Sequence, residues 1–464
     1  MTEGVGTDRS RSGLQRMLIP LALAQFICSF AGTNMNVMIT DISKDLNTTV
    51  QGVQITITIF LLVMAAFMIP CGKLTDRFGR KRCFMTGLIV YGIGALLSAA
   101  APGLGVLIIG NSILEGIGTA LLIPPVYILT TMLFTDLTSR ARAFGLISGA
   151  GGIGAATGPL IGGAITTWIT WRAAFLFQTA IIVAIVLLSR RLVDPVPPDP
   201  NRSFDVVGAI LSALGLCLLI AGILAADNNG VAMAVLLAAG VLVLAWFFVY
   251  VRNRERAGKE PLLSIKLFRN RTSNLGLVTQ NVQWLMLMGV SFVVSVYLQV
   301  VRHYNAIQTG VIFTAATVGI LASSLTQERL AKKYPQRTLI AGGFVTTIVG
   351  IAVLLALAAS GTHSAWVYAP GLLLIGLGLG AALTPSVNIV QSAFPDEQQG
   401  EISGLSRSVS NLGSCLGTAI AGTILVANLT RHAYAASLIV VAVIGLVGLG
   451  VSLFLPRDLG NSSA

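Results

Sequence analysis

Charged residues are scarce in this 464-residue chain: they make up 10% of it, against about 25% in a typical soluble domain. Hydrophobic residues account for 55%, and 50 glycines add to that apolar and small fraction. A water-soluble fold cannot hide so much apolar surface, because much of any protein's surface faces water. The composition therefore excludes a soluble enzyme, a disordered chain and a disulfide scaffold. Long apolar runs without alternation also argue against a membrane β-barrel. An all-α integral membrane protein remains.

Cysteine and histidine are also few. The cysteines number five, an odd count, and all lie in or beside apolar segments, which predicts small buried hydrophobes. The three histidines fall near predicted outer loops without metal-ligand spacing. The pattern Gly149-x-Gly151-x-x-Gly154 matches a dinucleotide fingerprint, but no strand precedes it and no acid follows at the required distance. With no nucleophile, metal cluster or phosphate loop, we expect no enzyme, no metal site and no cofactor.

Fourteen apolar segments are long enough to span a bilayer, which takes about 20 helical residues. They predict transmembrane helices near residues 17–39, 54–73, 83–101, 105–133, 143–167, 173–189, 206–225, 231–251, 274–301, 306–325, 338–359, 366–390, 403–427 and 433–455. The first segment is long and lacks a small-residue cleavage pattern, so a cleaved signal peptide is not expected.

The distribution of Lys and Arg predicts the orientation. With the N-terminus inside, the inner loops hold 25 of the 30 cations, the outer loops hold four, and Arg407 falls within a helix. Because Lys and Arg accumulate in cytoplasmic loops, both termini are expected in the cytoplasm of a multi-pass cell-membrane protein. The same rule explains the net charge of +12 without a nucleic-acid partner.

A weak internal repeat divides the chain. Gly118, Pro125, Phe134 and Asp136 recur as the same residue types 260 positions later. Two related halves are typical of transporters, whose binding site lies at the midplane between them. We expect an N-terminal six-helix half at 1–192, a linker with an inserted helix pair and a basic loop at 193–272, and a C-terminal six-helix half at 273–464.

The loop between the second and third predicted helices carries the strongest motif, Gly72-Lys-Leu-Thr-Asp76-Arg77-Phe-Gly79-Arg80. Its glycines permit a tight turn and close helix approach, and its acid can meet the positive end of a neighbouring helix. It resembles the signature loop of the major facilitator superfamily. The resemblance implies a conformational latch in which Arg80 pairs with Asp136; the latch residues are Gly72, Asp76, Arg77, Gly79, Arg80 and Asp136.

The fifth predicted helix carries a second motif, formed by Gly154, Gly158, Pro159, Gly162 and Gly163. Glycines at this spacing give a smooth face that a facing helix can approach, and the proline introduces a bend. The motif is similar to the antiporter motif of drug-exporting major facilitators. The fourteen-helix pattern further resembles the fourteen-helix branch of the drug:proton antiporters, over nearly the whole chain.

Two departures from that branch affect proton coupling. The family's first helix carries an aspartate near Ala31, and this chain has none there. Its fourth helix carries Arg-x-x-Gln-Gly, where this chain has Ser112-Ile-Leu-Glu115-Gly116. Glu115 is the one acid deep inside a predicted span, where an ionised carboxylate is costly and a functional role is expected. It is our candidate proton carrier; the alternative is a structural Glu bonded to Asn111 or Ser112.

Polar side chains form stripes at helical spacing in three spans, and such faces must point away from lipid. They predict a central cavity or, alternatively, hydrogen bonds that hold helices together. The cavity candidates are Gln25, Thr33, Asn36, Gln280, Gln283, Arg407 and Asn411.

These observations together predict a monomeric secondary transporter in the lipid bilayer. We expect it to export small amphiphilic compounds or drugs by alternating access, with the proton gradient as energy source and protons as the coupled ion. A uniporter or a solute:proton symporter is the alternative within transport. A non-transporting receptor or scaffold is the alternative outside it, and the two intact motifs speak against that alternative.

Overall fold

The structure is a computed structural model that describes residues 4–134, 137–190, 192, 194, 198–199, 203–226, 229–359, 365–395 and 398–456. Fourteen of its helical segments are long and apolar enough to cross a membrane, which confirms the all-helical prediction. The spanning helices are α1 (Gly4–Asn34), α3 (Val50–Phe78), α4 (Arg80–Ala99), α6 (Gly116–Leu133), α7 (Leu137–Trp168), α8 (Trp171–Ser189), α9 (Val206–Leu224), α10 (Gly230–Arg256), α11 (Arg271–Val296), α12 (Ala306–Lys333), α13 (Gln336–Ala359), α14 (Ala369–Gln391), α15 (Gln399–Val426) and α16 (Arg431–Ser452).

Short segments extend or connect these helices. Two of the spans contain a π-helical stretch: η2 (Ile108–Glu115) lies between α5 (Leu104–Leu107) and α6, and η4 (Tyr297–Val301) follows α11. π-Helical turns are rare and often accompany functional sites. The other short elements are η1 (Met35–Val37), α2 (Ile39–Asp45), η3 (Ile265–Arg269) and η5 (Ala365–Tyr368).

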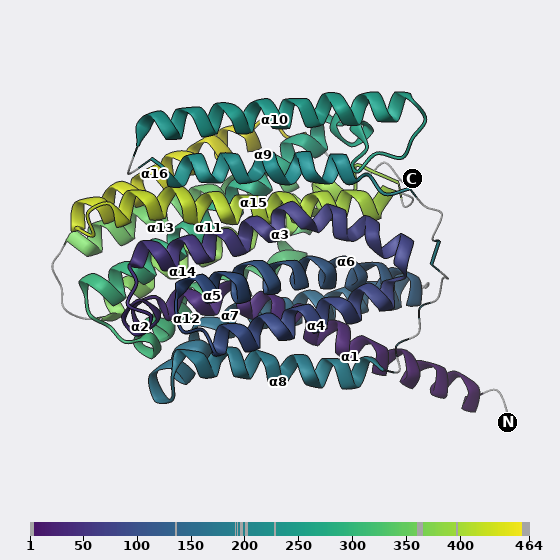
Figure 1. The fold of residues 1–464 in the computed structure, drawn as a ribbon, viewed down its shortest axis with the longest axis horizontal. Helices are drawn as coiled ribbons and strands as arrows, with labels where there is room; N and C mark the ends of the chain where they lie inside the picture. Colours follow the sequence, from purple (N-terminus) through teal and green to yellow (C-terminus); the bar gives the residue numbers. More distant parts are fainter. Residues whose placement is uncertain are drawn as a thin grey trace.

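The helices form one elongated bundle in which they run roughly along its length (Figure 1). Because the number of spans is even, α1 begins and α16 ends at the same end of the bundle. We call it the inner end, after its predicted cytoplasmic position, and the opposite end the outer end. Five of the seven spans that begin at the outer end are capped by side-chain oxygens that accept backbone N–H groups, which otherwise lack partners. These caps are Thr49, Thr170, Asn229, Asn305 and Thr430.

Helix packing repeats along the chain. In the first six spans α1 packs on α7, α4 on α6, and α3 on α6. The last six spans form the corresponding pairs: α11 packs on α15, α13 on α14, and α12 on α14. The two sets meet where α3 lies along α15 and where α7 lies along α12. This pattern is what two related six-helix units would produce, and the exact boundaries at residues 192 and 272 stay a prediction.

The remaining pair, α9 and α10, packs together at the edge of the bundle (Figure 1). Of these two, α9 contacts both α3 and α15, so it covers the seam between the two six-helix sets.

The expectation that all five cysteines are buried is wrong for one of them. Cys217 of α9 is exposed, whereas the other four cysteines are buried as expected. A helix packed on one side only leaves its opposite face to lipid, where a thiol is tolerated.

Candidate functional site

A polar cluster, which we call the central cluster, joins the two six-helix sets through side chains of α1, α6 and α15. The guanidinium of Arg407, on α15, donates through Nη2 to the hydroxyl oxygen of Tyr127, on α6. Its Cζ also lies 4.4 Å from the centroid of the Tyr127 ring, a cation–π distance. The Tyr127 hydroxyl donates in turn to Oε1 of Gln25, on α1, at 3.3 Å. Two sequence-predicted cavity residues are therefore linked through a tyrosine that the sequence analysis did not select.

Unfilled space adjoins this cluster. A Cβ placed on Gly404, one turn before Arg407, would meet no atom within 4 Å. The same holds for Gly32, which lies two turns beyond Gln25 on nearly the same face of α1. Asn411, one turn after Arg407, is partly exposed, as Arg407 itself is. Open space therefore lies beside Gly404, one turn from Arg407, and beside Gly32, which is about 10 Å along α1 from Gln25.

Phe144 of α7 supplies an aromatic wall for the cluster. Its ring stacks on Tyr127 with the centroids 5.9 Å apart and the planes 21° apart. Arg407, Tyr127 and Phe144 together present a cation beside two aromatic faces. Such a mixture of charge and apolar surface suits an amphiphilic small molecule.

Two other cavity candidates, Thr33 on α1 and Asn36 on η1, lie at helix contacts. Thr33 Oγ1 donates to the carbonyl oxygen of Ala155, on α7, at 3.1 Å. The carbonyl oxygen of Asn36 accepts from Gln299 Nε2 at 2.8 Å and from the hydroxyl of Ser295. The Asn36 contacts join the outer end of α1 to α11 and η4, so they hold the two six-helix sets together there.

Gln280 and Gln283 of α11 are buried and take part in interhelical hydrogen bonds. Gln280 donates to Ser410 Oγ at 2.9 Å and accepts from Ser406 Oγ at 2.8 Å, both on α15. Gln283 donates to Ser386 Oγ, on α14, at 2.7 Å. The structure therefore places these two glutamines between helices of the C-terminal set, apart from the Arg407–Tyr127–Gln25 cluster.

Glu115 ends the π-helical segment η2 and is fully buried. Its carboxyl group faces α4, where Ser98 Oγ lies 3.4 Å from Oε1 and Tyr91 is the second polar neighbour. The Tyr91 hydroxyl donates to Oε1 of Gln178, on α8. Ser112 instead donates to the carbonyl oxygen of Thr56 at 2.7 Å, so it is not the partner of Glu115 that the structural alternative invoked.

Cys28 of α1 is buried, and its thiol is within electrostatic range of both Glu115 and Arg407. The candidate proton carrier and the cation of the polar cluster thus share Cys28 as a common neighbour within electrostatic range.

The signature loop forms a compact turn between α3 and α4. Gly79 has a φ of +94°, a conformation that disfavours other residues, which explains the glycine there. Asp76 Oδ1 accepts from Arg80 Nη2 at 3.1 Å. Arg77 lies over the neighbouring Phe78 ring at 5.5 Å, and Gly72 packs near Pro124 of α6. The predicted Arg80–Asp136 pair lies outside the described residues.

The sequence analysis missed Asp194, which follows the sixth span. Its Oδ2 accepts from the backbone N–H of Arg80 at 2.6 Å and of Lys81 at 3.3 Å. A carboxylate at a helix N-terminus is favourable because the N–H groups there lack partners. An acid that comes far later in the chain, in a proline-rich stretch, gives no local signal for this cap.

The glycines of the fifth-span motif lie at the junction of three helices. Gly154, Gly158 and Gly162 face α1, where an added Cβ would press on its backbone or on Asn34. Gly163 faces the backbone of Ala306, on α12, and Gly310 of α12 in turn faces the carbonyl of Pro159. The motif thus provides the close approach that the spacing predicts, both within the first set and across to the second.

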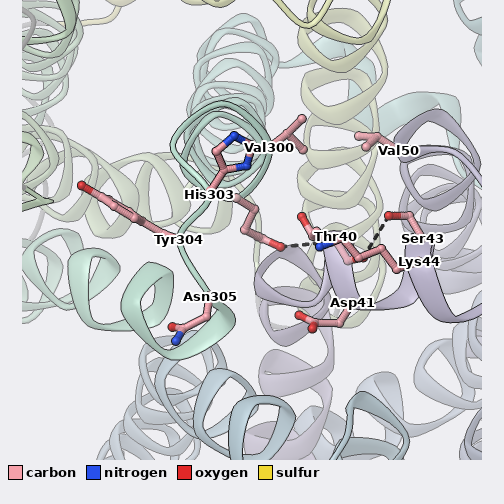
Figure 2. Close-up of a pocket in the computed structure, with 10 residues that line it drawn as sticks. Thr40, Asp41, Ser43, Lys44, Val50, Val300, His303, Tyr304 and Asn305 are labelled. Atoms are coloured by element: carbon pink, nitrogen blue, oxygen red, sulfur yellow. Dashed lines mark hydrogen bonds between the residues drawn. The ribbon is translucent and has the colours of Figure 1, made fainter. Parts of the chain in front are cut away.

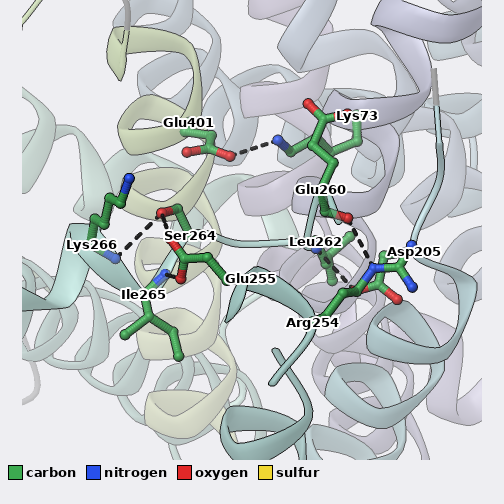
Figure 3. A network of polar contacts seen from close by, with 10 residues as sticks. All are labelled: Lys73, Asp205, Arg254, Glu255, Glu260, Leu262, Ser264, Ile265, Lys266 and Glu401. Carbon is green, nitrogen blue, oxygen red and sulfur yellow. Dashed lines mark hydrogen bonds and ion pairs between the residues drawn. The ribbon is translucent and has the colours of Figure 1, made fainter. Parts of the chain in front are cut away.

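At the inner end, an ion pair forms a second contact between the two six-helix sets. Lys73 Nζ, on α3, lies 2.6 Å from Glu401 Oε1, in the first turn of α15 (Figure 3). Nearby, the buried Asp205 caps α9 and accepts from the backbone N–H of Leu262 at 3.0 Å, and Arg254 lies 3.6 Å from it. These bonds tie the inserted helix pair to the basic loop that leads into α11.

The outer end contains a cavity of about 470 Å³ (Figure 2). It lies between the segment after α1 and the segment after η4, and its lining includes Asp41, Lys44, His303 and Tyr304. Burial raises the pKa of Asp41. The cavity does not include Arg407, Tyr127 or Gln25, so it is separate from the central cluster. Among the described residues, no group of three His, Cys, Asp or Glu side chains could hold a metal ion.

A fourteen-span bundle whose two helix sets meet around a polar cluster has the architecture of a secondary transporter. The family model for the Major Facilitator Superfamily matches residues 21–418 and 277–463. The chain belongs to that superfamily. It is therefore a multi-pass transporter of the bacterial cell membrane and not an enzyme, as the sequence predicted.

Similar curated proteins include drug-resistance transporters. The chain is 30% identical to the puromycin resistance protein pur8 of Streptomyces alboniger, over 88% of this chain and 81% of that protein. It is 28% identical to the multidrug efflux pump LfrA of Mycolicibacterium smegmatis, over 80% and 73% of the two chains. It is also 26% identical to the riboflavin transporter RibZ of Clostridioides difficile, over 90% and 89%.

Solved structures share the fold. A crystal structure of the peptide transporter POT in complex with sulfate matches with a TM-score of 0.70 over 95% of each chain, at 18% identity. At this identity the likeness concerns the fold alone.

Proposed function

We propose that this protein exports small amphiphilic compounds, drugs among them, in exchange for protons. The observation that carries the proposal is the Arg407–Tyr127–Gln25 cluster, which draws on α15, α6 and α1 and borders unfilled space. A site shared by both six-helix sets can change shape when the sets rock against each other. The names of several relatives, which include efflux pumps and a puromycin resistance protein, support export of drugs.

Alternating access requires contacts that break at one end while others form. The outer end is joined by the Asn36–Gln299 bond and by the approach of α7 to α12. The inner end is joined by the Lys73–Glu401 ion pair. We propose that the transport cycle loosens these two groups of contacts in turn, and that one monomer suffices because it contains both sets.

Glu115 is the proposed proton carrier. It is fully buried beside Tyr91 and Ser98, and a neutral carboxyl costs far less there than an ionised one. Both Glu115 and Arg407 are within electrostatic range of the Cys28 thiol, which supports a link between the proton site and the substrate cluster. Loading of a proton from outside and release of it inside would then drive substrate outward.

A solute:proton symporter or a uniporter is the second candidate. The absence of the family's first-helix aspartate favours it. Proteoliposomes with an imposed pH gradient distinguish the candidates, with a panel of fluorescent compounds as substrates. Export predicts that movement of compound opposite to the proton flow requires the gradient. Movement in the direction of the proton flow identifies a symporter, and gradient-independent equilibration identifies a uniporter.

A further inference from the structure

Arg407 has no carboxylate partner among the described residues. The ion pairs of that part of the chain join Lys73 to Glu401, Arg80 to Asp76, Arg172 to Asp45, and Arg254 to Asp205. The guanidinium of Arg407 instead contacts the ring and hydroxyl of Tyr127. A guanidinium has more N–H donors than one hydroxyl oxygen can accept, so it retains donors for another group.

Two acids of the spans, Glu401 and Glu115, contact other residues and not Arg407. Glu401 lies six positions before Arg407 on α15 and pairs with Lys73 at 2.6 Å. Glu115 faces Ser98 and Tyr91 of α4. Within the described part of the chain, the central cluster therefore offers a cation without a carboxylate, and a positively charged substrate would meet repulsion there. A substrate with a carboxylate or sulfonate would supply the missing counter-charge.

The surroundings fit an anion that carries an apolar body. The open position at Gly404, one turn before Arg407 on α15, leaves room beside the guanidinium-bearing helix face. Tyr127 and Phe144 stack into an aromatic surface against which rings or alkyl groups can pack. The planar guanidinium can bind a carboxylate or sulfonate through two parallel hydrogen bonds, which a lysine cannot do.

We propose that the substrates of this transporter are anionic amphiphiles, whose acidic group binds Arg407 and whose apolar part packs on Tyr127 and Phe144. The inference rests on the proposed export function and names its substrate class.

The experiment compares two dyes that share an aromatic skeleton. 8-Anilinonaphthalene-1-sulfonate carries a sulfonate, and N-phenyl-1-naphthylamine lacks it; ethidium serves as a cationic probe. Transport of each dye is measured in proteoliposomes with a pH gradient. Binding is measured separately, as thermal stabilisation of the detergent-purified protein. We expect the sulfonate dye to be transported and to stabilise the protein more than the other two.

Variants of Arg407 test whether its guanidinium causes the preference for the sulfonate dye over the neutral dye. Arg407→Gln should lower affinity for the sulfonate dye by about tenfold to a hundredfold, the usual range for loss of hydrogen bonds to a charged group. It should leave the neutral dye within about twofold. Arg407→Lys should recover part of the affinity, since it restores the charge without the planar fork. The matched control is Arg329→Gln, which removes the same charge from an exposed position on α12.

The outcomes separate this inference from the proposed function. If ethidium or the neutral dye is exported and the sulfonate dye is neither bound nor moved, export stands and the anionic substrate class is wrong. If the sulfonate dye binds in an Arg407-dependent manner but no dye accumulates under a pH gradient, the substrate class stands and coupled export is wrong. Equal sulfonate affinity in Arg407→Gln and wild type also overturns the inference.

Discussion

Gly158→Ala tests whether the fifth-span motif acts through close packing. An added Cβ at this position would lie 3.1 Å from the carbonyl oxygen of Phe30 and 3.3 Å from the backbone nitrogen of Asn34, and it would overlap the Thr33 hydroxyl. The Thr33 hydroxyl can rotate away, but the other two contacts are with the backbone of α1 and cannot be relieved by a rotamer change. Overpacking of this kind costs about 1–3 kcal/mol.

Gly152→Ala is the matched control on the same helix. No atom lies within 4 Å of a Cβ built there. Both substitutions gain the same helix propensity, about 1 kcal/mol for Gly to Ala. The difference in unfolding free energy between the variants therefore isolates the packing term, and we expect Gly158→Ala to be the less stable by about 1–3 kcal/mol.

The assay is reversible unfolding in mixed detergent micelles, followed by circular dichroism, with transport measured on the same preparations. We expect Gly152→Ala to transport as wild type does. Gly158→Ala should slow turnover, because it separates α1 from α7 within the N-terminal helix set. Equal stability and equal turnover of the two variants would refute the packing account of the motif.

The remaining predictions concern orientation, the inserted pair and the outer end. In a background without native cysteines, a membrane-impermeant maleimide added outside should label Lys44→Cys and not Lys259→Cys; the reverse pattern would overturn the orientation. Asp205→Ala should destabilise the protein by about 3–5 kcal/mol, the usual cost of breaking a buried ion pair, and unchanged unfolding would contradict its assigned role. Hydrogen bonds from Arg172 and Trp171 lower the pKa of Asp45, so their contribution is complete above the ordinary Asp range and is lost as pH falls through the lowered pKa. Trp171 fluorescence should report this acid transition, and its persistence in Asp45→Asn would contradict the assignment.

Much of the fold could be predicted from the sequence because a bilayer imposes a simple rule. Each span needs a long apolar run, and all fourteen predicted runs correspond to helices. The glycines of the fifth span were also informative, since a smooth helix face has few purposes other than close packing. The sequence could not predict the π-helical turn that ends at Glu115. A local change in the backbone hydrogen-bond pattern does not alter the hydropathy of the residues involved.

The candidate site was harder to predict. The polar stripes identified buried side chains, but they could not show which helix each one faces. Gln280 faces serines of α15 in its own helix set, whereas Gln25 is linked to Arg407 across the bundle. Tyr127 gave no signal, because a tyrosine in a span is compatible with packing alone. Pairings such as Lys73 with Glu401 depend on tertiary contacts between residues more than 300 positions apart.

The most direct test of proton-coupled export is concentrative transport by Glu115→Gln in proteoliposomes. The matched control is Glu260→Gln, which removes an acid from the loop outside the spans. Glutamine keeps the shape of Glu115 and most of its hydrogen-bonding capacity but cannot titrate. The account predicts that Glu115→Gln loses accumulation driven by a pH gradient and retains substrate exchange at equilibrium, while Glu260→Gln behaves as wild type. Accumulation by Glu115→Gln against a substrate gradient, with the pH dependence of the wild type, would contradict it.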